Sequence, residues 1–199
     1  MAQPAINLSG DASGAFTAAA VAAGVITSGS TFDPYASDEN FLLGAYIFED
    51  VGVSAYKGAA PLIANKTYLE AAAGILAAEA YHAGLIRTIL YRKGLQTPNG
   101  APALITAANQ ISDARDSLDG TVTNSATGVI GDDDQGITGS DPTISNIVPT
   151  DANGLAYSRS VAQVHNIVYL TNTAKIGGGF FPNGTNNRLD SLRTSGANA

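Results

Sequence analysis

Hydrophobic residues recur at helical spacing in two long stretches of the chain. From Glu39 to about Ile63 they lie three and four positions apart, and an alanine-rich stretch after Thr67 repeats the pattern. Asn65 or Thr67 can cap the second helix, and Gly94 is placed to end it. Because only a short link separates the two helices, we predict that they pack as an antiparallel hairpin.

Each long helix carries one stripe of residues that we expect to share a face. The first stripe is Leu42, Ala45, Glu49, Val53 and Tyr56. The second is Leu69, Ala72, Leu76, Glu79, Ala83, Ile86 and Leu90. Arg87, Arg92 and Lys93 lie toward the C-terminal end of the second helix, where cations suit the helix dipole.

Shorter elements surround the hairpin. An alanine-rich helix begins after Asp11 or Ser13 and ends near Gly24, and Ser37 or Asp38 can cap the first long helix. A further helix is predicted at about 103–118, and another at 157–170. Residues 119–156 have no periodicity and are expected to be irregular, and a loop anchored by Phe180 and Phe181 follows the last helix.

The predicted fold class is mainly α, with an antiparallel helical hairpin, extra short helices and long irregular loops. We divide the chain into an N-terminal extension, 1–37, a helical core, 38–118, and a loop-rich C-terminal region, 119–199.

Composition removes several classes of function. Among 199 residues the net charge is −7 and no block of Lys or Arg stands out, which argues against nucleic acid as a partner. There are no cysteines, so disulfides, cysteine-ligated metals and cysteine nucleophiles are excluded. Residues 1–11 do not form a signal peptide, and the apolar stretch 16–26 is too short to cross a bilayer, so no membrane span is expected.

Glutamate is rare, and its positions are informative. Two of the four glutamates, Glu49 and Glu79, lie on the apolar stripes, and His82 lies one helical turn after Glu79. Burying a carboxylate costs several kcal/mol, roughly, unless it is paired or binds a cation. Two interpretations remain open: an acidic–imidazole pair at the edge of the core, or a metal half-site.

The metal interpretation has a specific chemistry. One Glu on a helix and Glu-x-x-His on its neighbour make half of a carboxylate-bridged dinuclear site in a helical bundle. Carboxylates with imidazole suit iron or manganese. We therefore name Glu49, Glu79 and His82 as candidate metal ligands, and no residue as catalytic.

A second acidic cluster is weaker. Asp132, Asp133, Asp134 and Asp141 could hold calcium, but they lack the regular alternation and terminal Glu of an EF-hand loop. A solvated loop is the favoured interpretation. No hydrolase or nucleotide-binding motif occurs.

Two segments resemble a known family. FDPYASDENFLLGAYIFEDVGVSAYKGAAPLI (32–63) and YLEAAAGILAAEAYHAGLIRTILY (68–91) are similar to the ferritin-like domain of the desiccation-related protein family of bacteria and plants. IVPTDANGLAYSRS and GGFFPNG are similar to that family's C-terminal region. The resemblance implies a ferritin-like hairpin, a periplasmic or secreted location, and Glu49, Glu79 and His82 as the family's second Glu and second Glu-x-x-His.

The chain also departs from that family. There, the first Glu-bearing helix and the first Glu-x-x-His helix precede the segment PAINLSGDA, near which this chain begins. The expected hairpin is thus half of a four-helix bundle. Either the chain is a truncated or processed piece, or two copies meet across a two-fold axis. We predict a homo-oligomer, a dimer or larger, that covers the apolar face of the long helices.

Two functions follow. The chain is either a stress-related protein that binds iron or manganese and oxidises Fe²⁺ or reacts with peroxide, or a non-enzymatic, self-assembling or desiccation-protective protein with a vestigial metal site.

Overall fold

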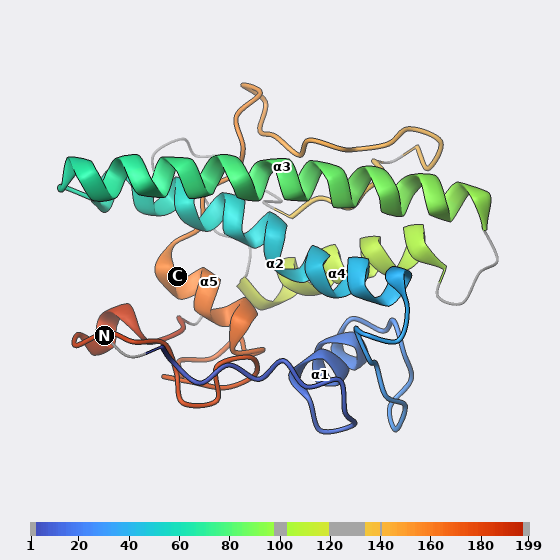
Figure 1. The fold of residues 1–199 in the computed structure, drawn as a ribbon, viewed down its shortest axis with the longest axis horizontal. Coiled ribbons are helices and arrows are strands. Elements are labelled where there is room, and N and C mark those ends of the chain that lie inside the picture. The colour runs from blue at the N-terminus through green and yellow to red at the C-terminus, as the bar shows by residue number, and fades with distance from the viewer. Residues whose placement is uncertain (1–2, 98–102, 120–133, 140, 197–199) are drawn as a thin grey trace.

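The structure is a computed structural model that describes residues 3–97, 103–119, 134–139 and 141–196. Over these residues it is mainly α-helical, with isolated bridges in place of strands. Helix α2 (Asp38–Ala59) and helix α3 (Lys66–Gln96) run antiparallel, side by side, joined by the short 3-10 helix η1 (Ala60–Leu62) (Figure 1). This pair is the predicted hairpin.

Side-chain caps fix where the two long helices begin. The Ser37 hydroxyl accepts a hydrogen bond from the Asn40 backbone N–H, and the Asn65 side chain accepts from those of Thr67 and Tyr68. The prediction that Gly94 ends α3 is wrong. Gly94 lies inside the helix, and an added Cβ there would be 2.6 Å from Ile105 Cγ1, so its role is to let the next helix approach closely.

Shorter helices complete the core. Helix α4 (Leu104–Asp119) packs against α2 and α3, and α1 (Ala15–Ala22) lies on the far side of α2 from α3 (Figure 1). Helix α5 (Val161–Val168) is shorter than predicted because Ser160 forms a capping box with Gln163. The 3-10 helix η2 (Asp190–Leu192) lies near the end of the described residues.

For the first short helix, α1, the predicted C-terminal end is confirmed and the predicted N-cap is wrong. Its N-cap is Gly14, without a side-chain cap, so neither Asp11 nor Ser13 has the predicted role. Asp11 instead accepts hydrogen bonds from the backbone and hydroxyl of Ser13. The helix ends before Gly24, whose positive φ of 74° is the expected stop.

Three aromatic rings join distant parts of the sequence in one core. Phe16 of α1, Phe48 of α2 and Phe180 of the C-terminal loop meet edge to face, with centroids 4.7–6.0 Å apart. Phe180 is fully buried, which confirms it as a loop anchor. Residues from all three segments defined on the sequence therefore contribute to the same core.

The stripe predicted on α3 is confirmed, whereas the α2 stripe is only half-buried. On α3, Ala72, Ala83, Ile86 and Leu90 are buried. The most buried apolar side chains of α2 lie on the neighbouring face: Leu43, Tyr46, Ile47 and Val51. They are buried because α1, α4, α5 and the C-terminal loop cover this side of α2 as well.

The irregular segment 141–156 runs along α3 (Figure 1). We call it the strap. Tyr91 Oη donates to the Thr143 carbonyl at 2.8 Å, and Arg87 Nε donates to the Asn146 carbonyl at 3.0 Å. The described part of 119–156 is thus irregular, as predicted. Asp132 and Asp133 lie outside the described residues.

Within the described ranges, no helix combines the length and the apolar character that crossing a bilayer requires.

Candidate functional site

The three residues predicted as metal ligands approach one another across the α2–α3 contact. Nδ1 of His82 lies 3.2 Å from Oε2 of Glu49. The side chain of His82 is 59% exposed and that of Glu49 is 22% exposed. The group therefore lies at the edge of the hairpin, between the core and solvent.

Glu79 is held over a glycine of the opposite helix. A Cβ built on Gly52 would lie 2.5 Å from Oε2 of Glu79 and 2.7 Å from its Cδ. Glycine at this position leaves room for the carboxylate in its present place against α2, and a larger residue would displace the end of the Glu79 side chain. Gly52 was not predicted as part of the site, although it follows Glu49 by three positions, about one helical turn.

The environment of Glu79 favours its neutral form. Burial, a hydrogen bond with Glu49 and the charge of Glu49 together raise the pKa of Glu79 to about 7, against the opposing effect of the charge of His82. The carboxylates of Glu49 and Glu79 lie close together, and the raised pKa of Glu79 means that it keeps a proton up to near neutral pH. A bound cation would compensate both negative charges, and Glu79 would then lose its proton.

The donor atoms fit iron or manganese in kind, because carboxylates and imidazole are the ligands those ions take in helical bundles. They do not form a closed set. Across the part of the chain that the structure describes, no three His, Asp or Glu side chains are grouped closely enough to hold a metal ion. The assignment of Glu49, Glu79 and His82 as ligands stays a prediction.

The other histidine has a structural environment. His165 is buried on α5, its ring stacks on Tyr169 with centroids 4.8 Å apart, and its Nε2 lies 3.1 Å from the Thr185 hydroxyl. Burial lowers the pKa of His165, so the neutral ring is favoured.

A buried network of charges lies beside the hairpin, and the sequence analysis did not predict it. Its members are three arginines and three aspartates: Arg87, Arg115, Arg159, Asp50, Asp119 and Asp134. Arg87 and Arg115 both donate to Asp50 Oδ2, at 2.7 and 3.0 Å. The charges of these three arginines and three aspartates balance one another.

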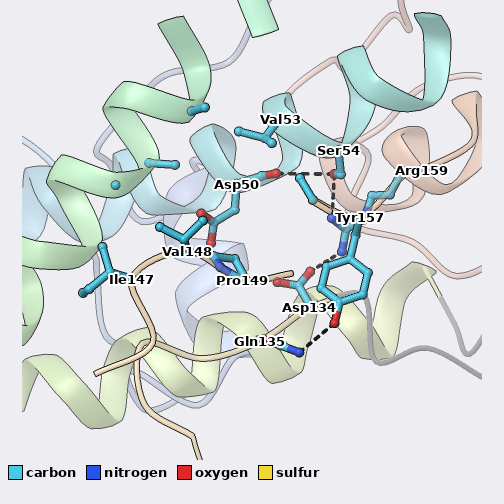
Figure 2. Close-up of a pocket in the computed structure, with 14 residues that line it drawn as sticks. Asp50, Val53, Ser54, Asp134, Gln135, Ile147, Val148, Pro149, Tyr157 and Arg159 are labelled. Atoms are coloured by element: carbon cyan, nitrogen blue, oxygen red, sulfur yellow. Dashed lines mark hydrogen bonds and ion pairs between the residues drawn. The ribbon is translucent and has the colours of Figure 1, made fainter. Parts of the chain in front are cut away.

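The network ties the strap side of the molecule to the helices. Asp134 forms an ion pair with Arg115 of α4. It also pairs with Arg159, which precedes α5 and donates to Ser54 of α2 at 2.7 Å (Figure 2). Asp134 is therefore no solvated or calcium-binding residue, which corrects the interpretation of the acidic cluster. Asp141 is exposed and accepts from Thr143.

One sequence signal could have revealed part of this network. Arg87 follows Ala83 by four positions and precedes Leu90 by three, so it lies on the buried side of α3 rather than on a solvated edge. Its carbonyl partners Gln135, Gly136 and Asn146 could not be predicted, because no periodicity places residues 134–156.

Comparison with known proteins identifies the relationship. Residues 1–92 match the family model described as a ferritin-like domain. The chain is 36% identical over 132 residues to the desiccation-related protein PCC13-62 of Craterostigma plantagineum, across 65% of this chain and 41% of that protein. It is 27% identical over 167 residues to the ferritin-like catalase Nec2 of Nesocodon mauritianus, across 79% of this chain and 50% of that protein.

The chain spans about half the length of the curated relatives that it matches. No solved structure matches it. The antiparallel α2–α3 pair lies within the matched residues except for the last turn of α3. Residues 1–92 therefore match the ferritin-like domain family, and the chain is similar in sequence to a desiccation-related protein.

Proposed function

We propose that the chain binds iron or manganese through Glu49, Glu79 and His82, and that its activity is reaction with peroxide or the oxidation of Fe²⁺ with dioxygen or peroxide as the electron acceptor. The observation that carries this proposal is the meeting of two carboxylates and an imidazole across the α2–α3 contact, with the pKa of Glu79 raised to about 7. A periplasmic or secreted location is part of the proposal on the family resemblance alone.

The protein residues have distinct tasks in this proposal. Glu49 and Glu79 supply negative charge that is unfavourable without a cation, so they favour metal binding. His82, whose Nδ1 lies beside Glu49 Oε2, supplies a nitrogen donor. Gly52 gives the Glu79 carboxylate its place. The metal itself would supply the electron transfer that amino-acid side chains do not perform.

The partner that completes the site is proposed to be a second half-bundle from another copy of the chain. The apolar stripe of α3, which was expected to form the interface between copies, is packed against α2. A different face of α3 is therefore available for that interface. Tyr68, Ile75 and His82 follow one another at intervals of seven on α3, and Leu85 lies beside them. The side chains of Tyr68, Ile75 and Leu85 are 42–69% exposed. We call this surface the open face.

An apolar groove of about 340 Å³ lies on α2 and shares Gly52 with the candidate site. Its lining residues include Phe48, Val51, Val168 and Phe181. Exposed apolar surface of this kind supports an interface.

Metal binding is tested by titrating the metal-free full chain with Mn²⁺ in a calorimeter. We expect saturable binding that is lost in Glu79→Gln and His82→Gln. Glu70→Gln is the matched control, because Glu70 lies on the same helix and is exposed. Absence of saturable binding, or equal binding by all four proteins, contradicts the proposal.

A second function is favoured by a different observation. Because the described residues contain no closed metal-holding group, the hairpin could serve packing and desiccation protection with a vestigial site. Peroxide consumption by the manganese- or iron-loaded chain distinguishes the two functions. Consumption that disappears in His82→Gln supports the first, and a loaded chain that leaves peroxide unchanged supports the second.

A further inference from the structure

A cavity of about 110 Å³ lies on the opposite side of the α2–α3 contact from His82, under the strap. Figure 2 shows Asp50, Asp134 and Tyr157 around it, with Val148 and Pro149 closing one side. Most of its wall is apolar and comes from three elements: Val53 of α2, Ala80 and Ala83 of α3, and Ile147, Val148, Pro149 and Ala156 of the strap. An apolar cavity with a few polar groups is the usual form of a small-molecule site.

The hydrogen-bond donors around this cavity are already engaged. Arg159 donates to Asp119, Ser54 and Asp134 through its three nitrogens. Tyr157 Oη donates to the Thr150 carbonyl, and Gln135 Nε2 donates to Tyr157 Oη. An anion would therefore find its possible partners occupied and would face carboxylates as well.

One acceptor at the cavity has spare capacity. Both arginines that bind Asp50 use its Oδ2 atom. Within the described residues, no hydrogen bond to the other oxygen, Oδ1, occurs, and the side chain is 9% exposed. A buried carboxylate oxygen without a hydrogen bond is energetically unfavourable, so Asp50 Oδ1 is suited to accept a hydrogen bond from a ligand.

We propose that this cavity binds a small molecule with a short alkyl body and a hydroxyl or ammonium group at one end. The alkyl part lies against Val53, Ala83 and Val148, and the polar end donates to Asp50 Oδ1. The size agrees with a ligand of a few carbon atoms, since an apolar cavity of about 150 Å³ holds benzene. The site is separate from the candidate metal ligands, and it stands whether or not they bind metal.

Two glycines of α3 give a matched pair of variants. An added Cβ meets nothing within 4 Å at either Gly84 or Gly74, so both positions have open space. Gly84 lines the cavity, whereas Gly74 does not. Leucine at either position also favours the helix over glycine. Gly84→Leu therefore fills the cavity, and Gly74→Leu is the control for the substitution itself.

The experiment uses the full chain with ¹³C-labelled alanine methyl groups, observed by NMR. Three probes with the same number of carbon atoms are titrated: 1-propanol, propylammonium and propionate. We expect saturable shifts of the Ala80 and Ala83 methyls with 1-propanol or propylammonium, and at least tenfold weaker binding of propionate. Gly84→Leu loses these shifts, and Gly74→Leu keeps them.

Three results overturn the proposal: no saturable shift with either donor probe, equal binding of propionate, or unchanged binding by a folded Gly84→Leu. If Gly84→Leu does not fold, Ala80→Leu fills the cavity from the neighbouring turn and is judged by the same shifts of Ala83. The comparison among the three probes on the unmodified chain remains decisive in either case.

Discussion

At the scale of single residues, the candidate site depends on a glycine as much as on its charged members. Glu49, Glu79 and His82 could be predicted because glutamate is rare and Glu-x-x-His has helical spacing. Gly52 could not, because its importance lies in a contact between helices: the Glu79 carboxylate occupies the space of the missing side chain. Periodicity along one helix contains no information on such a contact.

Replacing Gly52 with Ala tests this contact. The new methyl group displaces the end of the Glu79 side chain, so we expect Mn²⁺ affinity to fall roughly ten- to a hundredfold, the usual effect of losing the support of a ligand. Stability should be maintained, because alanine favours a helix interior over glycine by about 0.5–1 kcal/mol. Calorimetric titration and thermal unfolding measure the two effects. Gly74→Ala, where nothing is displaced, should keep both affinity and fold, and an unchanged affinity in Gly52→Ala contradicts the account.

The raised pKa of Glu79 predicts a pH dependence of stability in the metal-free chain. Its pKa in the folded state is about 7, above the ordinary value of 4.5, so the folded state binds the proton more tightly than the unfolded state. The stabilisation is complete below pH 4.5 and is lost as the pH rises through 7. Urea unfolding in the presence of a chelator should show that the unmodified chain loses stability relative to Glu79→Gln over this window. A constant difference between the two proteins across the window contradicts the assigned pKa.

At the scale of elements, helix positions followed from the sequence, and contacts between elements did not. Caps at Ser37 and Asn65 set the starts of α2 and α3 as predicted. The stripe predicted on α2 is only half-buried, and the neighbouring face is buried more deeply, because a helix covered on several sides has no single apolar stripe. Gly94 was taken as a helix end because close packing of Ile105 cannot be distinguished from a C-cap in one sequence.

The buried charge network predicts a large effect of one substitution. Asp134→Asn removes the one carboxylate charge that Arg115 and Arg159 share, while the volume is almost unchanged. Leaving buried charge uncompensated costs about 3–5 kcal/mol, so we expect a fall of that order in the free energy of unfolding, measured in urea. Glu39→Gln, in the exposed ion pair with Lys93, is the control and should change little. Similar effects of the two substitutions would mean that the network is not essential for folding.

At the scale of the whole molecule, the open face bears on assembly. Tyr68, Ile75 and Leu85 expose apolar surface beside His82, and the three candidate ligands lack the closed set that a metal requires. A second copy of the chain would cover the exposed apolar surface and would supply further metal ligands. The sequence predicted that apolar surface would be left over, but placed it on the stripe that α2 covers.

Light scattering after size-exclusion chromatography tests assembly. We expect a mass of at least twice that of one chain, because burial of the open face favours association. Ile75→Glu places a charge in that face and should reduce the mass to that of one chain. Leu155→Glu, an exposed apolar residue on the strap, should leave the assembly unchanged. A single-chain mass for the unmodified protein rules out self-association as the way in which the site is completed.

The most direct test of the central claim is an anomalous-scattering map from crystals of the Mn²⁺-loaded full chain. The account predicts a manganese peak contacted by Glu49, Glu79 and His82, and no such peak at this place in crystals of Glu79→Gln. A loaded chain whose manganese lies elsewhere, or crystals with no peak beside these three side chains, would contradict it.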